Sequence, residues 1–351
     1  GVIWIGTEDN GLLKYDLNTD TFTHYRFDAQ NTKAISSNTI NDIYQDSDDN
    51  IWIATDNGLS IYNYDENNFS RYNHSASNPY SLSSDYILTF FEDKNKMMWV
   101  GTFTGVNRWD HNMATFRQYS SNTNPELKNN NITSFTQFDE SSIIFSTYIG
   151  GIYQLSTADR KIRQIDFNQF FIEHRIMSLL DDGNTLWVGT RASGLYAVNM
   201  ITHEITTYQH DVNNDDSISA NSITDIIKDR NGNIWVSTFH QGLNLFNPNG
   251  TFRRFVKNES NSKKGPGSNH VLQLLEDDQG VIWLATFGGG LSRFEPRLET
   301  FTHLLHEENN PNSLSDDFTW IMLLDKDKNL WVGTQAAGLS VLSRENRYNS
   351  N

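Results

Sequence analysis

One sequence motif recurs eight times along the 351-residue chain, and its spacing limits the folds that the chain can adopt. Each copy resembles NIWVSTFHQGLNLF, residues 233–246: a Trp, a Thr three residues later, a variable segment, and a Gly before an alternating apolar run. The aligned threonines are 43 to 48 residues apart: Thr7, Thr55, Thr102, Thr147, Thr190, Thr238, Thr286 and Thr334. Repeats of this length indicate a propeller, a solenoid or an array, because one repeat cannot bury its own apolar face.

A single repeat, residues 221–256, predicts four short antiparallel strands. Ile223 and Ile226 anchor the first strand, and IWVST, LNLF and TFRRF follow as the second, third and fourth. The segments DRNGN and NPNG carry the residue types that form tight turns. Apolar character falls toward the last strand, as in a blade whose inner strands are buried and whose outer strand faces water. The sequence therefore predicts an all-β fold, a β-propeller of four-stranded antiparallel blades.

The number of blades is left open by the sequence. Eight second strands are visible but only seven first strands, so both seven and eight blades are consistent with the repeats. We expect one propeller over residues 1–351. Because the chain begins with Gly in the middle of a motif, we also expect it to be a fragment of a longer multidomain protein.

The invariant positions of the motif have structural explanations. Seven of the nine tryptophans occupy the motif position, where a large aromatic ring would fill the wedge between blades, and Ile144 replaces Trp in the fourth copy. The Gly that ends each variable segment is expected at positive φ, and the Thr is expected to bond to the turn backbone. Trp320 lies outside the motif in a first strand; we expect core packing for it, with the central channel as the alternative.

Composition excludes several classes of partner and chemistry. The net charge of −16 argues against nucleic acid and anionic membrane, and the only compact basic run, Lys263–Lys264 with Arg253–Arg254, is interpreted as surface charge. The absence of cysteine excludes disulfides and thiolate chemistry. No apolar run is long enough to span a membrane, and no signal peptide is recognisable.

The motif resembles a known family. Asn221, Ile223, Ile226, Asp229, Gly232, Ile234, Trp235, Thr238, Gly242 and Leu243 reproduce the two-component regulator propeller repeat almost in full. The connectors HDVNNDDSISAN and HEENNPNSLSDD are similar to the family's linking segment. The resemblance implies a periplasmic sensor region of an inner-membrane protein that recognises glycans. It also implies an adjacent propeller and an output domain, a hybrid histidine kinase or a diguanylate cyclase, as partners, and it allows a homodimer.

No catalytic residue, metal site or cofactor is expected. DSDDN (46–50) and DKDKN (325–329) lack the Gly and Glu that a calcium loop needs, and His303 and His306 would point to opposite faces of a strand. The sequence contains no nucleophile elbow, zinc-protease motif or phosphate-binding Gly loop.

The variable segment between the Thr and the Gly holds the candidate ligand-binding residues: Phe103, Tyr148, Arg191, Phe239, His240 and Phe287. Aromatic faces with a few polar groups suit a saccharide or another small polar ligand, whereas Glu8, Asp9 and Asp56 form an acidic sector. Neutral drift in a tolerant loop is the alternative. The sequence thus predicts a non-enzymatic sensor propeller. A propeller glycosidase or lyase and a non-binding interaction or dimerisation scaffold are the competing functions.

Overall fold

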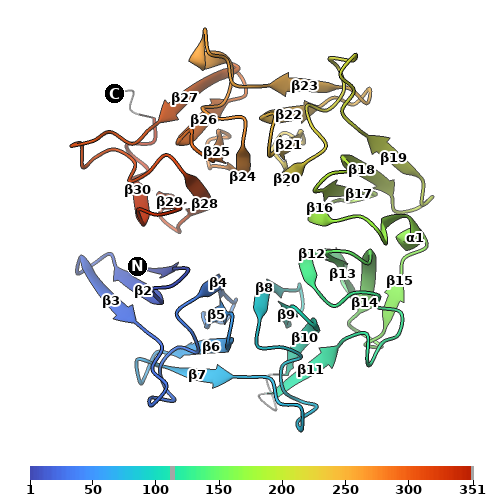
Figure 1. Ribbon diagram of the computed structural model, residues 1–351, viewed down its shortest axis with the longest axis vertical. Coiled ribbons are helices and arrows are strands. Elements are labelled where there is room, and N and C mark those ends of the chain that lie inside the picture. Colours follow the sequence, from blue (N-terminus) through green and yellow to red (C-terminus); the bar gives the residue numbers. More distant parts are fainter. Residues whose placement is uncertain (111–114, 349–351) are drawn as a thin grey trace. The chain divides into compact units, whose positions relative to one another are not determined.

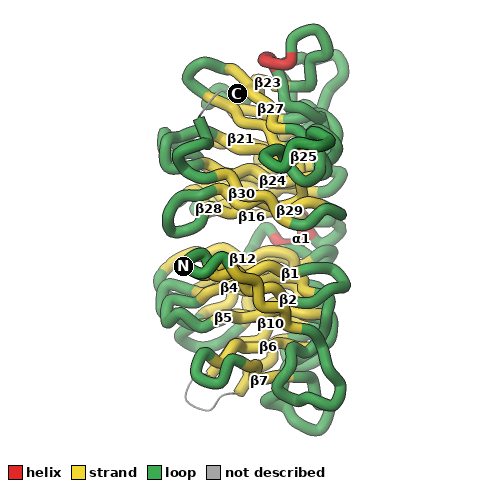
Figure 2. Tube along the Cα trace, turned by 90° about the vertical axis from the view of Figure 1, so that its left-hand side faces the viewer, coloured by secondary structure: helices red, strands yellow, loops and turns green. Residues whose placement is uncertain are grey.

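In the computed structural model, which describes residues 1–110 and 115–348, the chain forms eight antiparallel sheets (Figure 1). Six sheets have four strands and two have three, and strands adjacent in sequence are adjacent in each sheet. Strands and loops make up nearly all of the described chain (Figure 2). The fold is an all-β propeller with eight blades, as the repeats predict, and the open choice between seven and eight blades is settled at eight.

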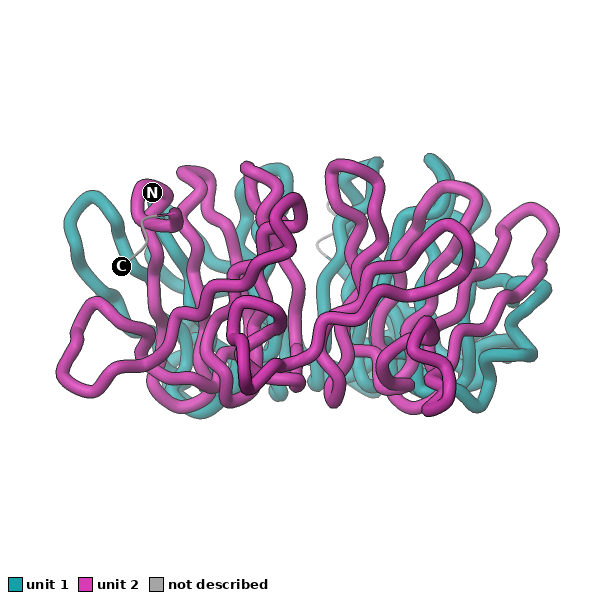
Figure 3. Tube along the Cα trace, turned by 90° about the horizontal axis from the view of Figure 1, so that it is seen from above, with its two compact units in different colours: residues 1–176 teal, residues 177–351 magenta. Residues whose placement is uncertain are grey.

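The blades divide between two compact units, residues 1–176 and 177–351 (Figure 3). The strands of unit 1 are β1 (Val2–Gly6), β2 (Leu12–Asp16), β3 (Thr21–Tyr25), β4 (Ile40–Gln45), β5 (Ile51–Thr55), β6 (Gly58–Asn63), β7 (Asn68–Tyr72), β8 (Ile87–Glu92), β9 (Met98–Thr102), β10 (Gly105–Asp110), β11 (Thr115–Tyr119), β12 (Ile132–Asp139), β13 (Ser142–Thr147), β14 (Ile152–Ser156) and β15 (Ile162–Gln164). A four-residue helix, α1 (Asn168–Phe171), follows β15.

Unit 2 repeats the same meander. Its elements are β16 (Ile176–Asp182), β17 (Thr185–Thr190), β18 (Leu195–Asn199), β19 (Ile205–Tyr208), β20 (Ile223–Lys228), β21 (Ile234–Thr238), β22 (Leu243–Phe246), β23 (Phe252–Phe255), the short 3-10 helix η1 (Ser262–Lys264), β24 (Val271–Glu276), β25 (Ile282–Thr286), β26 (Leu291–Glu295), β27 (Thr300–Leu304), β28 (Thr319–Leu324), β29 (Leu330–Thr334) and β30 (Leu339–Leu342). The four strands predicted for residues 221–256 are confirmed as β20 to β23.

The second strand of a blade is its most deeply buried strand. Every residue of β5, β9, β21 and β25 is buried, whereas in the first strand β20 only Ile223 and Ile226 are buried. The sequence predicted burial of both inner strands. The difference arises because a first strand has a sheet partner on one side only, so part of its surface stays accessible.

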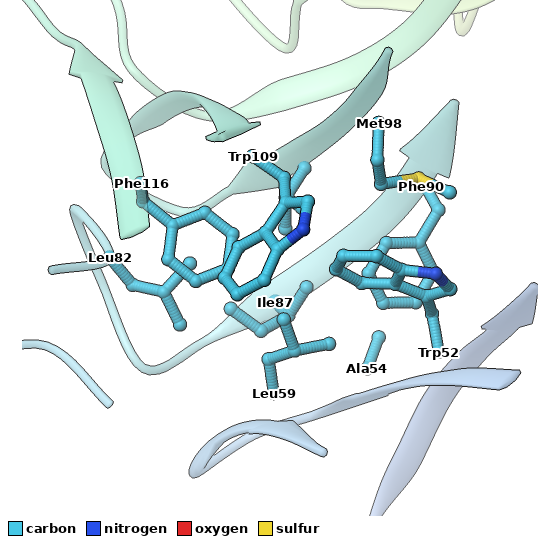
Figure 4. Close-up of a cluster of buried hydrophobic side chains, with 10 residues drawn as sticks. Trp52, Ala54, Leu59, Leu82, Ile87, Phe90, Met98, Trp109 and Phe116 are labelled. Carbon is cyan, nitrogen blue, oxygen red and sulfur yellow. The ribbon is translucent and has the colours of Figure 1, made fainter. Parts of the chain in front are cut away.

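The motif tryptophans join neighbouring blades, as predicted. In unit 1, Trp52 of β5 packs edge-on against Trp109 of the next blade, with ring centroids 5.6 Å apart, and against Phe90 at 6.1 Å (Figure 4). In unit 2, Trp235 packs in the same way against Phe294 of the next blade at 5.4 Å. Each blade therefore buries its face against its neighbour.

A turn aspartate holds each of several tryptophans in place. Asp229 accepts hydrogen bonds from the backbone N–H groups of Asn231 and Asn233 and from the indole Nε1–H of Trp235, at 2.9 Å in each case. The same indole bond recurs at Asp46, Asp93, Asp277 and Asp325. The template Asp thus closes the turn and satisfies a buried donor at once.

The other invariant positions also behave as predicted. Each motif Gly has positive φ, and at Gly242, with φ 71°, an added Cβ would lie 2.3 Å from the carbonyl oxygen of Phe255. Thr238 donates its hydroxyl hydrogen bond to the Gly242 carbonyl oxygen at 3.2 Å. The fourth copy is irregular: β12 and β13 pair with two register shifts, and Ile144 is buried where the other copies have Trp.

Neighbouring first strands are joined by half-buried polar side chains. Asp42 lies at a bulge in β4 and accepts the backbone N–H of Phe90 in β8 at 3.0 Å and that of Ile43 at 2.8 Å. In unit 2, Asp225 accepts the N–H of Leu274 at 3.0 Å from the corresponding bulge. These bonds fix the distance between adjacent inner strands.

Candidate functional site

The variable segments lie in the turns between second and third strands, where Thr and Gly hold the backbone. In unit 2, the Gln241 N–H donates to the Thr238 hydroxyl at 3.1 Å, and the N–H of Phe239 donates to the carbonyl oxygen of Ser222 at 3.0 Å. The backbone of the turn is therefore fixed, and its side chains are free to differ between copies. Two of the six predicted ligand-binding residues lie in unit 1 and four in unit 2.

In unit 1, the two predicted ligand-binding residues, Phe103 and Tyr148, each contact the residue that immediately precedes a first strand. The ring of Phe103, which is exposed, lies 5.8 Å from that of Tyr86, the residue before β8. The guanidinium carbon of Arg175 lies over the ring of Tyr148, 5.6 Å from the ring centroid.

Phe239 and His240 of unit 2 are brought together with a residue that the sequence did not single out. The ring of His270, which precedes β24, lies 5.0 Å from Phe239 and 5.6 Å from His240. Phe239 and His240 are themselves 5.0 Å apart. Three rings thus form one cluster across two neighbouring blades.

Phe287 belongs to a second, adjoining cluster. Its ring meets that of Phe318 edge-on at 4.7 Å and that of Trp320 at 6.3 Å. The backbone N–H of Phe287 donates to the carbonyl oxygen of His270 at 2.9 Å, which joins the two clusters. We call Phe239, His240, His270, Phe287, Phe318 and Trp320 together the aromatic row.

The expectation that Trp320 packs in the core is wrong. Its side chain is 53% exposed, and a register shift between Thr319 and Ile321 places it at a bulge in β28. The bulge breaks the inward and outward alternation of the strand, so the indole turns out of the core toward Phe287.

Arg191 is exposed in the turn after β17. The acidic residues Glu8, Asp9 and Asp56 are exposed in turns of unit 1. The aromatic row therefore contains three of the six predicted ligand-binding residues, Phe239, His240 and Phe287. Its other three members, His270, Phe318 and Trp320, were not predicted as ligand-binding residues.

A second variable position accounts for most of the residues that were missed. Tyr86, Arg175, His270 and Phe318 each immediately precede a first strand, at a position that also differs from copy to copy. The argument used for the turn between second and third strands could have found them, because the two positions are adjacent at the same end of the blade.

Other chemistry finds little support. Within the described residues, no group of three His, Asp or Glu side chains could hold a metal ion, and no helix is long and apolar enough to cross a membrane. Burial raises the pKa of Asp42 to about 6 and also raises that of Asp225, against the opposing effect of backbone hydrogen bonds. Both carboxylates accept hydrogen bonds from backbone N–H groups of the inner strands, so neither is positioned as a general acid or base.

Comparison with known families identifies the repeats. The model described as "Two component regulator propeller" matches residues 34–57, 81–104, 217–240, 265–288 and 313–336. The resemblance in the sequence is confirmed at the level of the repeat: the chain carries two component regulator propeller repeats. A search of curated protein sequences found no match.

Solved structures share the fold at low identity. The extracellular domain of BT4673 from B. thetaiotaomicron, described both as a one component and as a hybrid two component system, is 20% identical with a TM-score of 0.51. The alignment covers 100% of this chain and 51% of that one, so the chain spans about half of its length. PorZ of the type-IX secretion system of Porphyromonas gingivalis is 16% identical, with a TM-score of 0.62 over 97% of this chain and 51% of PorZ. The computationally designed Ika8 protein is 11% identical, with a TM-score of 0.63 over 97% and 93% of the two chains.

Proposed function

We propose that this chain is the ligand-recognition propeller of a bacterial signalling protein, of the two-component or a related type, and that it acts on the periplasmic side of the inner membrane. The two component regulator propeller repeats support the signalling role. The similar extracellular domain of a signalling system in B. thetaiotaomicron is consistent with the location.

The ligand that we propose is a small polar molecule of the saccharide class, and the aromatic row is the observation that carries this proposal. Six aromatic and imidazole rings from three neighbouring blades follow one another along one end of unit 2, and Trp320 and Phe318 are exposed. Flat rings offer their faces to sugar C–H groups, while His240 and His270 supply polar atoms for hydroxyl groups.

Calorimetry against a panel of neutral and acidic oligosaccharides tests the proposal. We expect a panel member to bind the wild-type chain, and we expect Phe239→Ala or Trp320→Ala to weaken that binding by about 10-fold or more, because each removes a stacking face. Phe22→Ala is the matched control, since Phe22 is an exposed aromatic residue of β3 outside the row. Equal binding by wild type, Phe239→Ala and Trp320→Ala would place the site elsewhere, and Arg191→Ala then tests the turn after β17.

One observation bears on the alternative function, a scaffold for protein interaction or dimerisation. Ile321, Leu323 and Val341 of the β28–β30 blade are exposed apolar side chains. The positions of Leu323 and Val341 correspond to those of Leu275 and Leu245, which pack into the cores between blades of unit 2. Ile321 corresponds to Gln273 of the preceding blade. The exposed side chains are thus of the kind that blades use against one another, and they do not favour a separate protein partner.

A further inference from the structure

Three arginines gather around a buried tyrosine where the β8–β11 blade meets the β12–β15 blade of unit 1. Arg108 on β10 lies directly opposite Arg117 on β11, and Arg160 lies in the turn between β14 and β15 with φ 61°. Burial raises the pKa of Tyr119, at the end of β11, and the charges of all three guanidinium groups act on its hydroxyl in the opposite direction. Strand pairing puts Arg108, Arg117 and Tyr119 on one face of the β10–β11 hairpin, and the charge of Arg160 acts on the Tyr119 hydroxyl from the neighbouring blade.

The cluster lacks the partners that buried charges normally have. Arg108 is 7% exposed and Tyr119 is 3% exposed, and both Nε of Arg108 and the hydroxyl of Tyr119 are buried without a hydrogen-bond partner. Arg117 approaches that hydroxyl without forming a hydrogen bond of good geometry. Across residues 1–110 and 115–348, none of the three arginines forms an ion pair with a carboxylate, and the nearby Asp159 pairs with Arg163 instead.

The corresponding junction of unit 2 shows what is missing. There Arg253 on β23 lies opposite Leu245, an apolar residue, and forms a two-pronged ion pair with Glu299. Glu299 is the positive-φ residue of the next blade's turn, the position that Arg160 holds in unit 1. Arg108 of unit 1 thus stands at the position of Leu245 in unit 2, and Arg160 stands at the position of Glu299.

The strand position of Arg108 has a counterpart in unit 2, the half-buried Arg293. Arg293 on β26 pairs with Glu295 at 3.3 Å and donates to the carbonyl oxygen of Arg347 at 2.7 Å. The Nε of Arg293 is likewise buried without a hydrogen-bond partner, so the difference between the two positions is the ion pair, which Arg293 has and Arg108 lacks. Like charges directly opposite each other on adjacent strands destabilise a sheet, and burying an unpaired charge costs free energy. A bound anion would reduce both costs.

We propose that Arg108, Arg117, Arg160 and the Tyr119 hydroxyl form a binding site for a tetrahedral oxyanion, sulfate or phosphate, as the inorganic ion or as a monoester. Guanidinium forks match the oxygen spacing of such ions, and a phenolic O–H adds one more donor. A dianion offsets the repulsion among the three positive charges. The site is separate from the aromatic row and does not depend on the saccharide proposal.

Thermal unfolding of the full chain tests the site. At about 10 mM sulfate or phosphate, with ionic strength held constant by chloride, we expect the wild-type Tm to rise by about 2–4 °C, because an ion that binds only the folded state stabilises it. Arg160→Glu supplies the carboxylate that unit 2 has at this position, so we expect this variant to melt higher than wild type in chloride and to lose the response to sulfate.

Three further variants and one ligand arm complete the experiment. Arg117→Gln, in an exposed position, should also lose the response, whereas Arg253→Ala and Phe239→Ala should retain it. A larger rise with a phosphate monoester than with phosphate identifies the ester as the ligand, and an equal rise identifies the inorganic ion. The proposal is overturned if wild type does not respond, if Arg160→Glu responds as wild type does, or if all variants rise equally, which is a general effect of sulfate on protein hydration.

Discussion

Replacing Trp235 with Ala should lower the free energy of unfolding by about 3–5 kcal/mol, the range for truncating a large buried aromatic side chain. Trp235 is 2% exposed and packs against Phe255 of its own blade and Phe294 of the next. Its loss would open a cavity between two blades and leave the Asp229 oxygen that receives the indole N–H without that donor. Urea unfolding of the wild-type and variant chains measures the difference.

Trp320→Ala is the matched control for this prediction, because it removes the same side chain from the same unit at an exposed site. We expect it to cost less than about 1 kcal/mol. A loss below about 1 kcal/mol for Trp235→Ala as well would mean that the interface between blades does not depend on the motif tryptophan.

The fold was predictable from the sequence because its determinants recur. Eight copies of Trp, Thr and Gly at one spacing give the strand order of a blade, and the Gly and Thr each act within a single turn. The role of the template Asp was not anticipated, because its bond to the indole, as at Asp229 and Trp235, joins two residues six positions apart across a hairpin. Only the folded turn brings them into contact.

The candidate sites were less predictable, because they depend on register and on neighbouring blades. His270 and Phe318 join the aromatic row from positions just before a first strand, and a bulge turns Trp320 outward against the expectation from alternation. The arginine cluster has no sequence signature at all. Arg108 and Arg117 are opposed by strand pairing, and Arg160 comes from another blade.

The stability of the chain should also depend on the ionisation of Asp42. Its half-buried carboxylate lies between the first strands β4 and β8 and accepts hydrogen bonds from the N–H groups of Ile43 and Phe90. Burial outweighs these bonds and raises the pKa of Asp42 to about 6, whereas the unfolded chain has a pKa of about 3.9 at this residue.

Because the folded pKa is the higher one, the folded state binds the proton more tightly than the unfolded state. The stability that the neutral carboxyl contributes is fully present below about pH 4 and is lost as the pH rises through about 6. Between these limits the change is at most about 2–3 kcal/mol. Asp42→Asn removes the titration, so we expect this variant to gain about that much relative to wild type between pH 4 and pH 7.

Urea unfolding of wild type and Asp42→Asn at several pH values across this window measures the relative gain. An amide offers one acceptor in place of two, so the variant starts from a lower stability at acid pH, and only the change in the difference with pH reports on Asp42. Asp48→Asn is the control, because Asp48 lies on the same blade with an exposed side chain, and its curve should run parallel to that of wild type. If the Asp42→Asn curve is parallel to wild type as well, the carboxylate is already ionised between the strands at pH 4, and the bonds from Ile43 and Phe90 outweigh its burial.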